Sequence, residues 1–290
     1  MADQHLCLLS VHAHPDDEAS KGAATVARYH AAGVRTVLVT CTGGEAGDIL
    51  NPAIDRPEVR ADLPAVRMRE LARAAEVIGY DVVELLGYRD SGMPDMPENA
   101  HPEAFANAEL DEAIGRLVAV IRRERPQVVI TYGEDQSVYP HPDHLRVHDI
   151  TVPAFERAGD PDAYPGTGEP WQPSKLYYSV WSRKRVELTH KRLLDLGLES
   201  PYDEKWLERP SQDERITTTV DVSAFGEVRL DALLAHETQI DPESPFWFAL
   251  PRDESIRVYP YDDYELARSL VGTEVPETDL FAGVTNAVRT

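Results

Sequence analysis

Residues 6–18 read Leu-Cys-Leu-Leu-Ser-Val-His-Ala-His-Pro-Asp-Asp-Glu, an apolar run that changes abruptly into a polar cluster. The run from Leu6 to Val11 is short and apolar and ends on a β-branched residue, which is typical of a buried strand. In α/β proteins, ligands bind beyond the carboxyl ends of such strands. The cluster at residues 12–18 is therefore the first place to look for a functional site.

Strands and helices alternate through the rest of the N-terminal half. Further strands are predicted at 34–42, 82–86 and 128–132, and helices at 20–32, 64–78 and 110–123. Gly33 and Gly79 follow two of these helices and are expected to end them. Alternation of this kind favours a mostly parallel, Rossmann-like sheet with helices on both faces.

The second half of the chain has a weaker pattern. Prolines and glycines at 160–173 indicate a loop or linker, so we divide the chain into a catalytic core at 1–160 and a C-terminal region at 161–290. Strands are expected at 176–181 and 216–222, and helices at 185–196 and 224–236. The stretch 241–264 mixes aromatic, proline and acidic residues. We expect this α+β region to complete the sheet and to cap the cleft.

The first polar cluster has the residue types of a metal site. His14 offers an imidazole nitrogen and Asp17 a carboxylate oxygen, and Pro15 bends the short loop that joins them. Asp16 remains as a carboxylate beside the ion, which makes it a candidate general base. An acidic helix N-terminus would also explain residues 15–18, but it would leave the histidines unexplained.

A second cluster follows the strand predicted at 128–132. Residues 139–149 read Tyr-Pro-His-Pro-Asp-His-Leu-Arg-Val-His-Asp, and His144 is the expected third ligand. His148 would lie one turn deeper if a helix begins near Pro142, so we interpret it as a packing residue. A helix cap with surface histidines is the alternative. The two clusters can meet if the first and fourth strands are neighbours, as in the common doubly wound order.

The composition indicates which binding partners and which cell compartment to expect. The chain has 290 residues and a formal net charge of −22, which repels nucleic-acid phosphates and anionic lipids. Two cysteines, no apparent signal peptide and no long apolar run predict a cytoplasmic protein without a membrane span. The first strand is not followed by Gly-x-Gly-x-x-Gly, which argues against a dinucleotide-dependent oxidoreductase. A non-catalytic sugar- or nucleotide-binding protein remains an alternative.

The motifs His14-Pro-Asp-Asp17 and His141-Pro-Asp-His144 resemble the signature of the LmbE/PIG-L family of zinc-dependent N-deacetylases and amidases. The resemblance covers roughly residues 5–160. Three further stretches, 40–45, 67–71 and 87–93, make the chain most similar to the bacterial mycothiol enzymes of that family. The likeness to the mycothiol enzymes implies that the substrate is a small pseudo-disaccharide. We expect the chain to be an amidase that cleaves the amide between glucosaminyl-inositol and an S-conjugated acetylcysteine. The alternative is a deacetylase that removes the acetyl group of N-acetylglucosaminyl-inositol.

The resemblance also implies a role for individual residues. The Zn²⁺ ligands would be His14, Asp17 and His144, although Fe²⁺ accepts the same ligands. Asp16 would be the general base. Tyr139 and His141 would contact the developing oxyanion or the leaving amine, and Asp143 would hydrogen-bond His141 and keep it charged. Substrate contacts are expected from Lys21, Glu45, Arg67 and Asp90. The sequence leaves the oligomeric state open.

Overall fold

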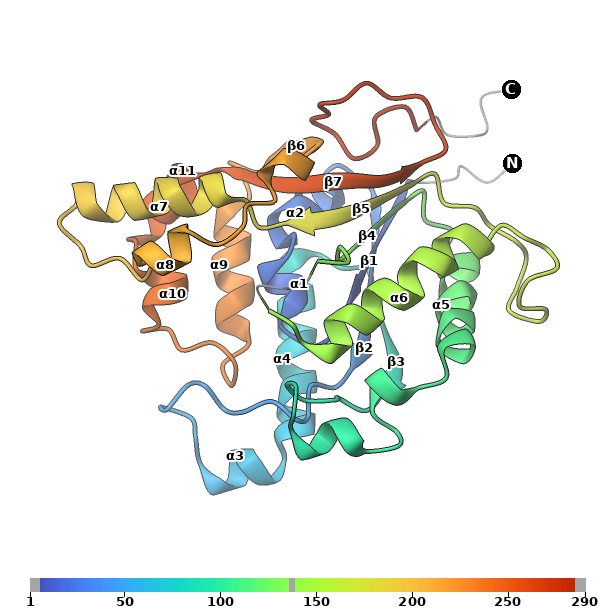
Figure 1. Ribbon diagram of the computed structural model, residues 1–290, viewed down its shortest axis with the longest axis horizontal. Helices are drawn as coiled ribbons and strands as arrows, with labels where there is room; N and C mark the ends of the chain where they lie inside the picture. Colours follow the sequence, from blue (N-terminus) through green and yellow to red (C-terminus); the bar gives the residue numbers. More distant parts are fainter. Residues whose placement is uncertain (1–5, 136–138, 285–290) are drawn as a thin grey trace.

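The structure is a computed structural model, and it describes residues 6–135 and 139–284. Within these ranges a seven-stranded sheet has the order β3-β2-β1-β4-β5-β7-β6 (Figure 1). Strands from both halves of the chain enter this one sheet. The predicted α/β architecture, mostly parallel with helices on both faces, is confirmed.

Five strands run parallel to one another. Four of them come from the N-terminal half of the chain, and the fifth comes from the second half. They are β1 (Cys7–His12), β2 (Arg35–Thr42), β3 (Val82–Tyr88), β4 (Val128–Thr131) and β5 (Lys175–Val180). β1 pairs with β2 on one side and with β4 on the other. The first and fourth strands are therefore neighbours, as expected, and their carboxyl ends meet at one edge of the sheet.

Of the last two strands in the sheet order, one was predicted, at 216–222, and one was not. β7 (Tyr261–Ser269) lies between β5 and β6 (Thr218–Asp221) and is antiparallel to both. The sequence did not indicate β7, because it carries Asp262 and Asp263, and aspartate is depleted in strands. Both aspartates are buried, and each is satisfied by a partner: Arg185 contacts Asp262, and the Tyr259 hydroxyl donates to Asp263.

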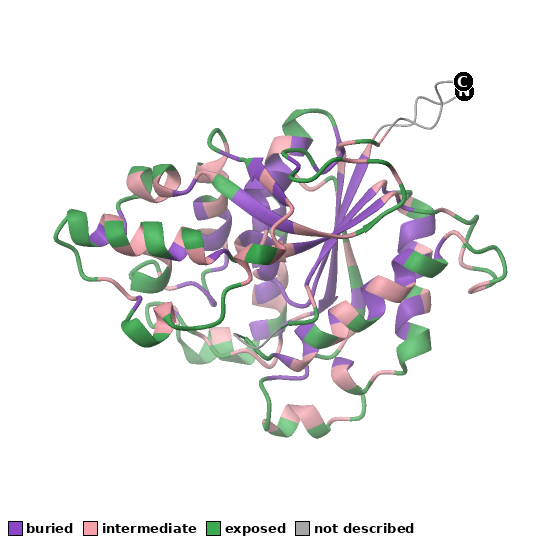
Figure 2. Cartoon of the chain, turned by 45° about the horizontal axis from the view of Figure 1, so that its top comes forward, coloured by how far each residue is buried: buried purple, intermediate pink, exposed green. Residues whose placement is uncertain are grey.

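Helices cover both faces of the sheet and enclose two apolar cores. α5 (Leu110–Glu124) and α6 (Pro142–Arg157) pack on one face. α2 (Ala23–Ala31), α4 (Leu63–Ile78) and α9 (Gly226–Ala235) pack on the other. The strands between them are buried, whereas the outer faces of the helices are exposed (Figure 2). None of the helices in the described residues is long and apolar enough to cross a membrane.

The helix predicted at 20–32 begins later than expected. α2 starts at Ala23, and a separate short helix, α1 (Asp17–Ser20), precedes it. Gly22 adopts a φ of 107°, a left-handed conformation that glycine tolerates, and it turns the chain between them. Gly79 ends α4, as predicted, and does so in a left-handed conformation. The remaining helices are α3 (Pro57–Ala61), α7 (Arg183–Asp195), α8 (Glu204–Leu207), α10 (Pro245–Phe248), α11 (Arg252–Val258) and the 3-10 turns Pro97–Ala100, Phe105–Asn107 and Asp213–Arg215.

A buried ion pair ties the C-terminal segment to the sheet. Lys175, at the start of β5, contacts the Glu277 carboxylate, and both side chains are fully buried. The hydroxyls of Tyr177 and Thr218 donate to the same carboxylate over 2.7 and 2.9 Å. The buried charges are thus paired and hydrogen-bonded, which a low-dielectric interior requires.

Candidate active site

The two polar clusters meet at the carboxyl end of the sheet. His14 and Asp17 follow β1, and His144 lies in the first turn of α6, which follows β4. His14 Nδ1 lies 3.5 Å from Asp17 Oδ2, and His144 Nε2 lies 3.3 Å from Asp17 Oδ1. All three residues are buried. The sheet thus brings together side chains that are 127 residues apart (144 − 17) in the sequence.

The spacing of these donor atoms fits a tetrahedral metal ion. Ligands at 2.0–2.1 Å from zinc lie roughly 3.3–3.4 Å from one another. The Nε2 atom of His14 is 3.1 Å from Asp143 Oδ2, and a carboxylate only accepts, so His14 donates there. With an ion bound, Nδ1 would lose its proton and direct a lone pair toward the ion beside Asp17. A metal-binding histidine is commonly oriented by a carboxylate in this way.

The local charge also favours a cation at this point. Burial alone would lower the pKa of His14, but hydrogen bonds to Asp143, Asp17 and Asp90 hold that pKa well above its usual value. Burial would raise the pKa of Asp17, yet Lys21 and His144 hold it well below its usual range. The Asp17 carboxylate is thus ionised and lies at a position that attracts positive charge. A divalent ion would supply that charge.

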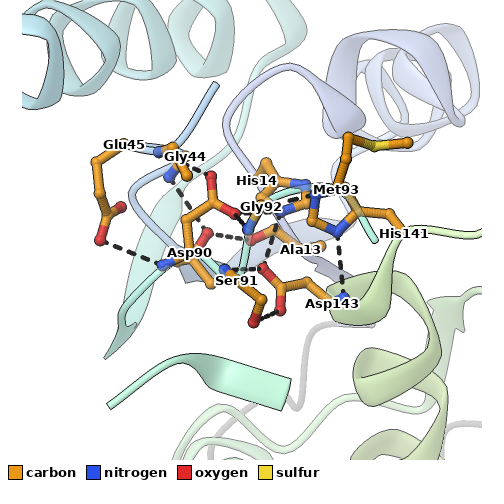
Figure 3. Close-up of polar contacts among 12 residues, drawn as sticks. Ala13, His14, Gly44, Glu45, Asp90, Ser91, Gly92, Met93, His141 and Asp143 are labelled. Atoms are coloured by element: carbon orange, nitrogen blue, oxygen red, sulfur yellow. Dashed lines mark hydrogen bonds and ion pairs between the residues drawn. The ribbon is translucent and has the colours of Figure 1, made fainter. Parts of the chain in front are cut away.

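Within the described residues, two groups of side chains could hold an ion, and both include His14. The second group adds Asp90, His141 and Asp143 on the Nε2 side of the His14 ring. There the Asp143 carboxylate already accepts the Ser91 backbone N–H over 3.0 Å, the Ser91 hydroxyl and the His14 ring (Figure 3). The Asp143 carboxylate is thus placed to orient the His14 ring from the side opposite Asp17.

The expected hydrogen bond from His141 to the Asp143 carboxylate is absent among the described contacts. Instead, the backbone N–H of Asp143 donates to His141 Nδ1 over 3.2 Å, where His141 caps α6 (Figure 3). Burial, together with His14, lowers the pKa of His141 to about 4. The prediction of a charged His141 is therefore wrong. The neutral ring accepts at Nδ1 and carries its proton on Nε2.

Asp16 is held in a strained conformation beside the candidate ligands. Its φ of 114° is unusual for a residue with a side chain, and its backbone N–H donates to Glu18 over 3.0 Å. The Arg67 guanidinium contacts the Asp16 carboxylate at 2.9 Å and the Pro15 carbonyl at 2.6 Å. Burial raises the pKa of Asp16, although Arg67 opposes the shift. A carboxylate with a raised pKa is a stronger base.

Arg67 and Asp90 occupy buried positions, not a solvated face or an exposed turn. Arg67 is 2% exposed and donates to the Gly44 carbonyl as well as to Asp16. Asp90 accepts the backbone N–H groups of Gly92 and Ala46 over 2.8 and 3.1 Å. Burial would raise the pKa of Asp90, but His14 and these bonds lower it below its usual range.

Lys21 and Tyr139 flank the candidate metal position. Lys21 Nζ lies 2.5 Å from Asp17 Oδ1. The half-exposed Tyr139 ring stacks on His141 with 5.9 Å between ring centres and meets His144 edge-on at 5.1 Å. Both residues line the same cavity as the candidate ligands. Glu45 does not: it accepts the Asp90 backbone N–H over 3.2 Å beside the cavity (Figure 3).

Several residues of the site were missed in the sequence. Ser91 anchors Asp143, and the buried Tyr132 hydroxyl lies 3.1 Å from His12 Nδ1. His236, at the end of α9, contacts Glu18 at 2.5 Å although 218 residues separate them. Ser91 stands inside a stretch that the sequence analysis had quoted. The contact between His236 and Glu18 leaves no local signal, because it depends on how α9 packs against α1.

The cavity extends well beyond these polar groups. Its volume is about 650 Å³, which is within the usual range for small-molecule sites. The candidate metal ligands form part of its lining. Four aromatic side chains line another part of it: Trp181, Trp206, Phe246 and Trp247. The site could therefore hold a polar group near the candidate metal position and an apolar group farther along.

Known proteins match this chain in sequence and in fold. The profile of a family described as PIG-L, GlcNAc-PI de-N-acetylase, matches residues 9–155. A "Mycothiol S-conjugate amidase" of Streptomyces coelicolor is 49% identical over 98% of this chain and 99% of its own. A "1D-myo-inositol 2-acetamido-2-deoxy-alpha-D-glucopyranoside deacetylase" of Geodermatophilus obscurus is 41% identical over 96% of this chain and 97% of its own.

A solved structure shares the fold. The N,N'-diacetylchitobiose deacetylase from Pyrococcus horikoshii superimposes with a TM-score of 0.62 over 90% of this chain and 83% of its own, at 18% identity. The resemblance inferred from the two histidine motifs is thus confirmed by the family profile and by full-length relatives. The chain belongs to the PIG-L (LmbE-like) family and is a hydrolase of the deacetylase and amidase class.

Proposed function

We propose that this protein is a zinc-dependent mycothiol S-conjugate amidase. It would cleave the amide between glucosaminyl-inositol and an S-conjugated acetylcysteine, as a step in thiol-dependent detoxification. The observation that carries the proposal is the 49% identity over almost the full length of a relative with that name, against 38–41% for the deacetylases compared with it. The aromatic part of the cavity supports the choice, because an S-linked group needs room beyond the amide.

His14, Asp17 and His144 would hold the zinc ion in this proposal. When bound, the ion would lower the pKa of a coordinated water and polarise the amide carbonyl. Fe²⁺ accepts the same ligand types, so metal analysis belongs with the functional assay. Asp143 would orient His14 through the 3.1 Å hydrogen bond to Nε2.

Asp16 would accept the proton of the attacking water. Its raised pKa suits a general base, and the Arg67 guanidinium fixes the position of its carboxylate. His141 would donate a hydrogen bond from Nε2 to the oxyanion as a neutral imidazole, and the Tyr139 hydroxyl would be a second donor. Asp16 would then return its proton to the departing amine, which is a poor leaving group until protonated.

The substrate's sugar and inositol hydroxyls would be bound near Arg67 and Asp90. Both residues line the cavity, although their polar atoms are largely engaged by the protein. Lys21 lies at the rim of the metal position and is a candidate contact for the acyl portion of the substrate. Glu45 would act on the substrate only through Asp90, whose backbone it holds.

The second candidate function is the deacetylation of N-acetylglucosaminyl-inositol. It is favoured by the name of the relatives that are 38–41% identical over most of this chain. The same base and donors would serve both reactions, since each cleaves an amide on the glucosamine nitrogen. The two functions differ only in the size of the acyl group that the cavity must accept.

A side-by-side assay separates the two functions. The zinc-loaded enzyme is given N-acetylglucosaminyl-inositol and an S-blocked mycothiol, and free amine is measured for each. The proposal expects a higher kcat/KM for the S-blocked substrate. Faster turnover of the acetyl sugar would replace the amidase assignment with the deacetylase and leave the family membership unchanged.

A further inference from the structure

The aromatic part of the cavity has a feature that the cleavage step does not use. Trp181 is 41% exposed and Phe246 is 40% exposed, and both line the cavity. Their rings are nearly parallel, at 16° and 6.2 Å between centres, and Trp247 meets Phe246 edge-on at 4.7 Å. Large apolar side chains that stay exposed inside a pocket commonly mark a ligand-binding surface.

The strand order sets the spacing between the strand that precedes this surface and the strand that precedes the candidate metal position. Trp181 directly follows β5, and β5 is two strands away from β1 on the parallel side of the sheet. Adjacent strands lie ~4.8 Å apart, so the carboxyl ends of β1 and β5 are roughly 10 Å apart. Both ends belong to the edge of the sheet where the cavity opens.

An S-conjugate whose amide lies at the metal position has a length of the same order as this strand spacing. Three bonds, or roughly 4 Å, separate the carbonyl carbon of a cysteine residue from its sulfur. A ring attached through one methylene has its centre roughly 4 Å farther on. The acetyl group of the deacetylase substrate ends one bond after the carbonyl, so it would leave the aromatic surface empty.

Two charged side chains in the cavity bear on which aromatic S-substituents would bind. Arg183 and Arg209 also line the cavity, and Arg209 lies over the Trp206 ring at 5.0 Å. Across residues 6–135 and 139–284, neither guanidinium forms an ion pair with a carboxylate. Arg185, by contrast, is neutralised by Asp262 at 3.1 Å. These two arginines therefore place positive charge beside the aromatic surface.

We propose that Trp181, Phe246 and Trp247 form a subsite for an aromatic S-substituent, and that Arg183 and Arg209 favour rings that are neutral or negatively charged over cationic rings. This inference rests on the proposed amidase function for the identity of the ligand. The stacking surface would bind the ring by its face, and the arginines would contact an acidic group at the ring's outer end.

The test compares four mycothiol conjugates: S-methyl, S-benzyl, S-(4-carboxybenzyl) and S-(4-trimethylammoniobenzyl). We expect a kcat/KM for S-benzyl at least tenfold above that for S-methyl, and a further preference for the carboxylate over the ammonium ring. Trp181→Leu should reduce the benzyl-to-methyl ratio roughly tenfold while S-methyl turnover stays within about twofold. Arg209→Gln should reduce the carboxylate-to-ammonium ratio alone.

Matched controls are available outside the cavity lining. Tyr261→Leu removes a 38% exposed aromatic ring that does not line the cavity, and Arg257→Gln removes an arginine paired with Asp253 at 3.2 Å. Neither control should alter the ratios. Equal turnover of S-benzyl and S-methyl by the wild type, or a benzyl-to-methyl ratio that Trp181→Leu leaves unchanged, would overturn the subsite.

Failure of the amidase assignment is distinguishable from failure of the subsite. If the conjugates are not hydrolysed but the acetyl sugar is, they are tested as competitive inhibitors of deacetylation. Tighter inhibition by S-benzyl than by S-methyl, lost in Trp181→Leu, would support the subsite without the amidase activity. Equal inhibition would refute it.

Discussion

Asp143→Asn tests the proposed orientation of the metal ligand His14. Asp143 is fully buried, and its Oδ2 atom accepts His14 Nε2 over 3.1 Å and the Ser91 backbone N–H over 3.0 Å, while Oδ1 accepts the Ser91 hydroxyl. Asparagine has the same shape and can keep its oxygen toward His14, because the Ser91 hydroxyl can rotate to accept from the new amide. The main loss is then the negative charge behind the imidazole.

The expected magnitude follows from that loss. Replacing a carboxylate that orients a metal-binding histidine typically costs 10–100-fold in metal affinity or activity. This corresponds to ~1.4–2.7 kcal/mol of binding free energy. If the amide instead turned its NH₂ group toward His14, the ring would have to accept at Nε2 and protonate Nδ1. Loss of the Nδ1 lone pair would weaken zinc binding still further.

The assay is zinc binding in competition with a chelator, with thermal unfolding of the metal-free protein as a check on the fold. Asp149→Asn is the matched control, since Asp149 is exposed on the same helix, α6. We expect Asp143→Asn to bind zinc 10–100-fold more weakly than the control. Equal zinc affinity in the two folded variants would refute the orientation of His14 by the Asp143 carboxylate.

Three further predictions concern the base, its partner and the C-terminal segment. Asp16→Asn should lower kcat by ~10²–10⁴ with zinc retained, measured by amine release and metal analysis. The pKa of Asp16 is raised, so the wild-type rate should already fall, as the pH is lowered, at a pH above the ordinary pKa of a carboxyl group. Arg67→Met removes a charge-assisted hydrogen bond worth ~1.5–3 kcal/mol and should lower kcat roughly 10–100-fold, and unchanged kinetics would exclude a positioning role. Lys175→Met leaves the Glu277 carboxylate buried and unpaired and should reduce the free energy of unfolding in urea by ~3–5 kcal/mol. The pKa of Glu277 is lowered, so its contribution to wild-type stability should be present above the unfolded pKa and lost as pH falls through the folded one.

The polar cluster after the first strand could be interpreted from the sequence because its signal is local. Apolar periodicity predicted β1, and the parallel order implied that its carboxyl end would meet that of β4. The structure places His14, Asp17 and His144 together accordingly. The residue types were sufficient to predict a metal site here, since histidine and aspartate are among the few side chains that bind zinc.

The hydrogen-bond partners within the site could not be predicted in the same way. The sequence placed Asp143 near His141, and only the start of α6 determines that the backbone of Asp143, not its carboxylate, contacts that ring. The protonation of His141 follows from this contact and from burial. Both depend on side-chain directions that sequence spacing does not define.

β7 shows the same limit at the level of the fold. Its aspartates argue against a strand when the sequence is read locally, and they are stable there only because Arg185 and Tyr259 arrive from other elements. The contact of His236 with Glu18 and the exposure of Trp181 within the cavity likewise depend on the packing of distant segments.

The sequence by itself determined the parallel core, the two histidine motifs and the family, because strand periodicity and metal-ligand chemistry depend on residue types at short spacing. Only the tertiary structure decided which atoms of those residues face one another and which aromatic rings share their cavity. Contacts between segments more than a hundred residues apart arise from the packing of the whole chain, and no local pattern encodes them.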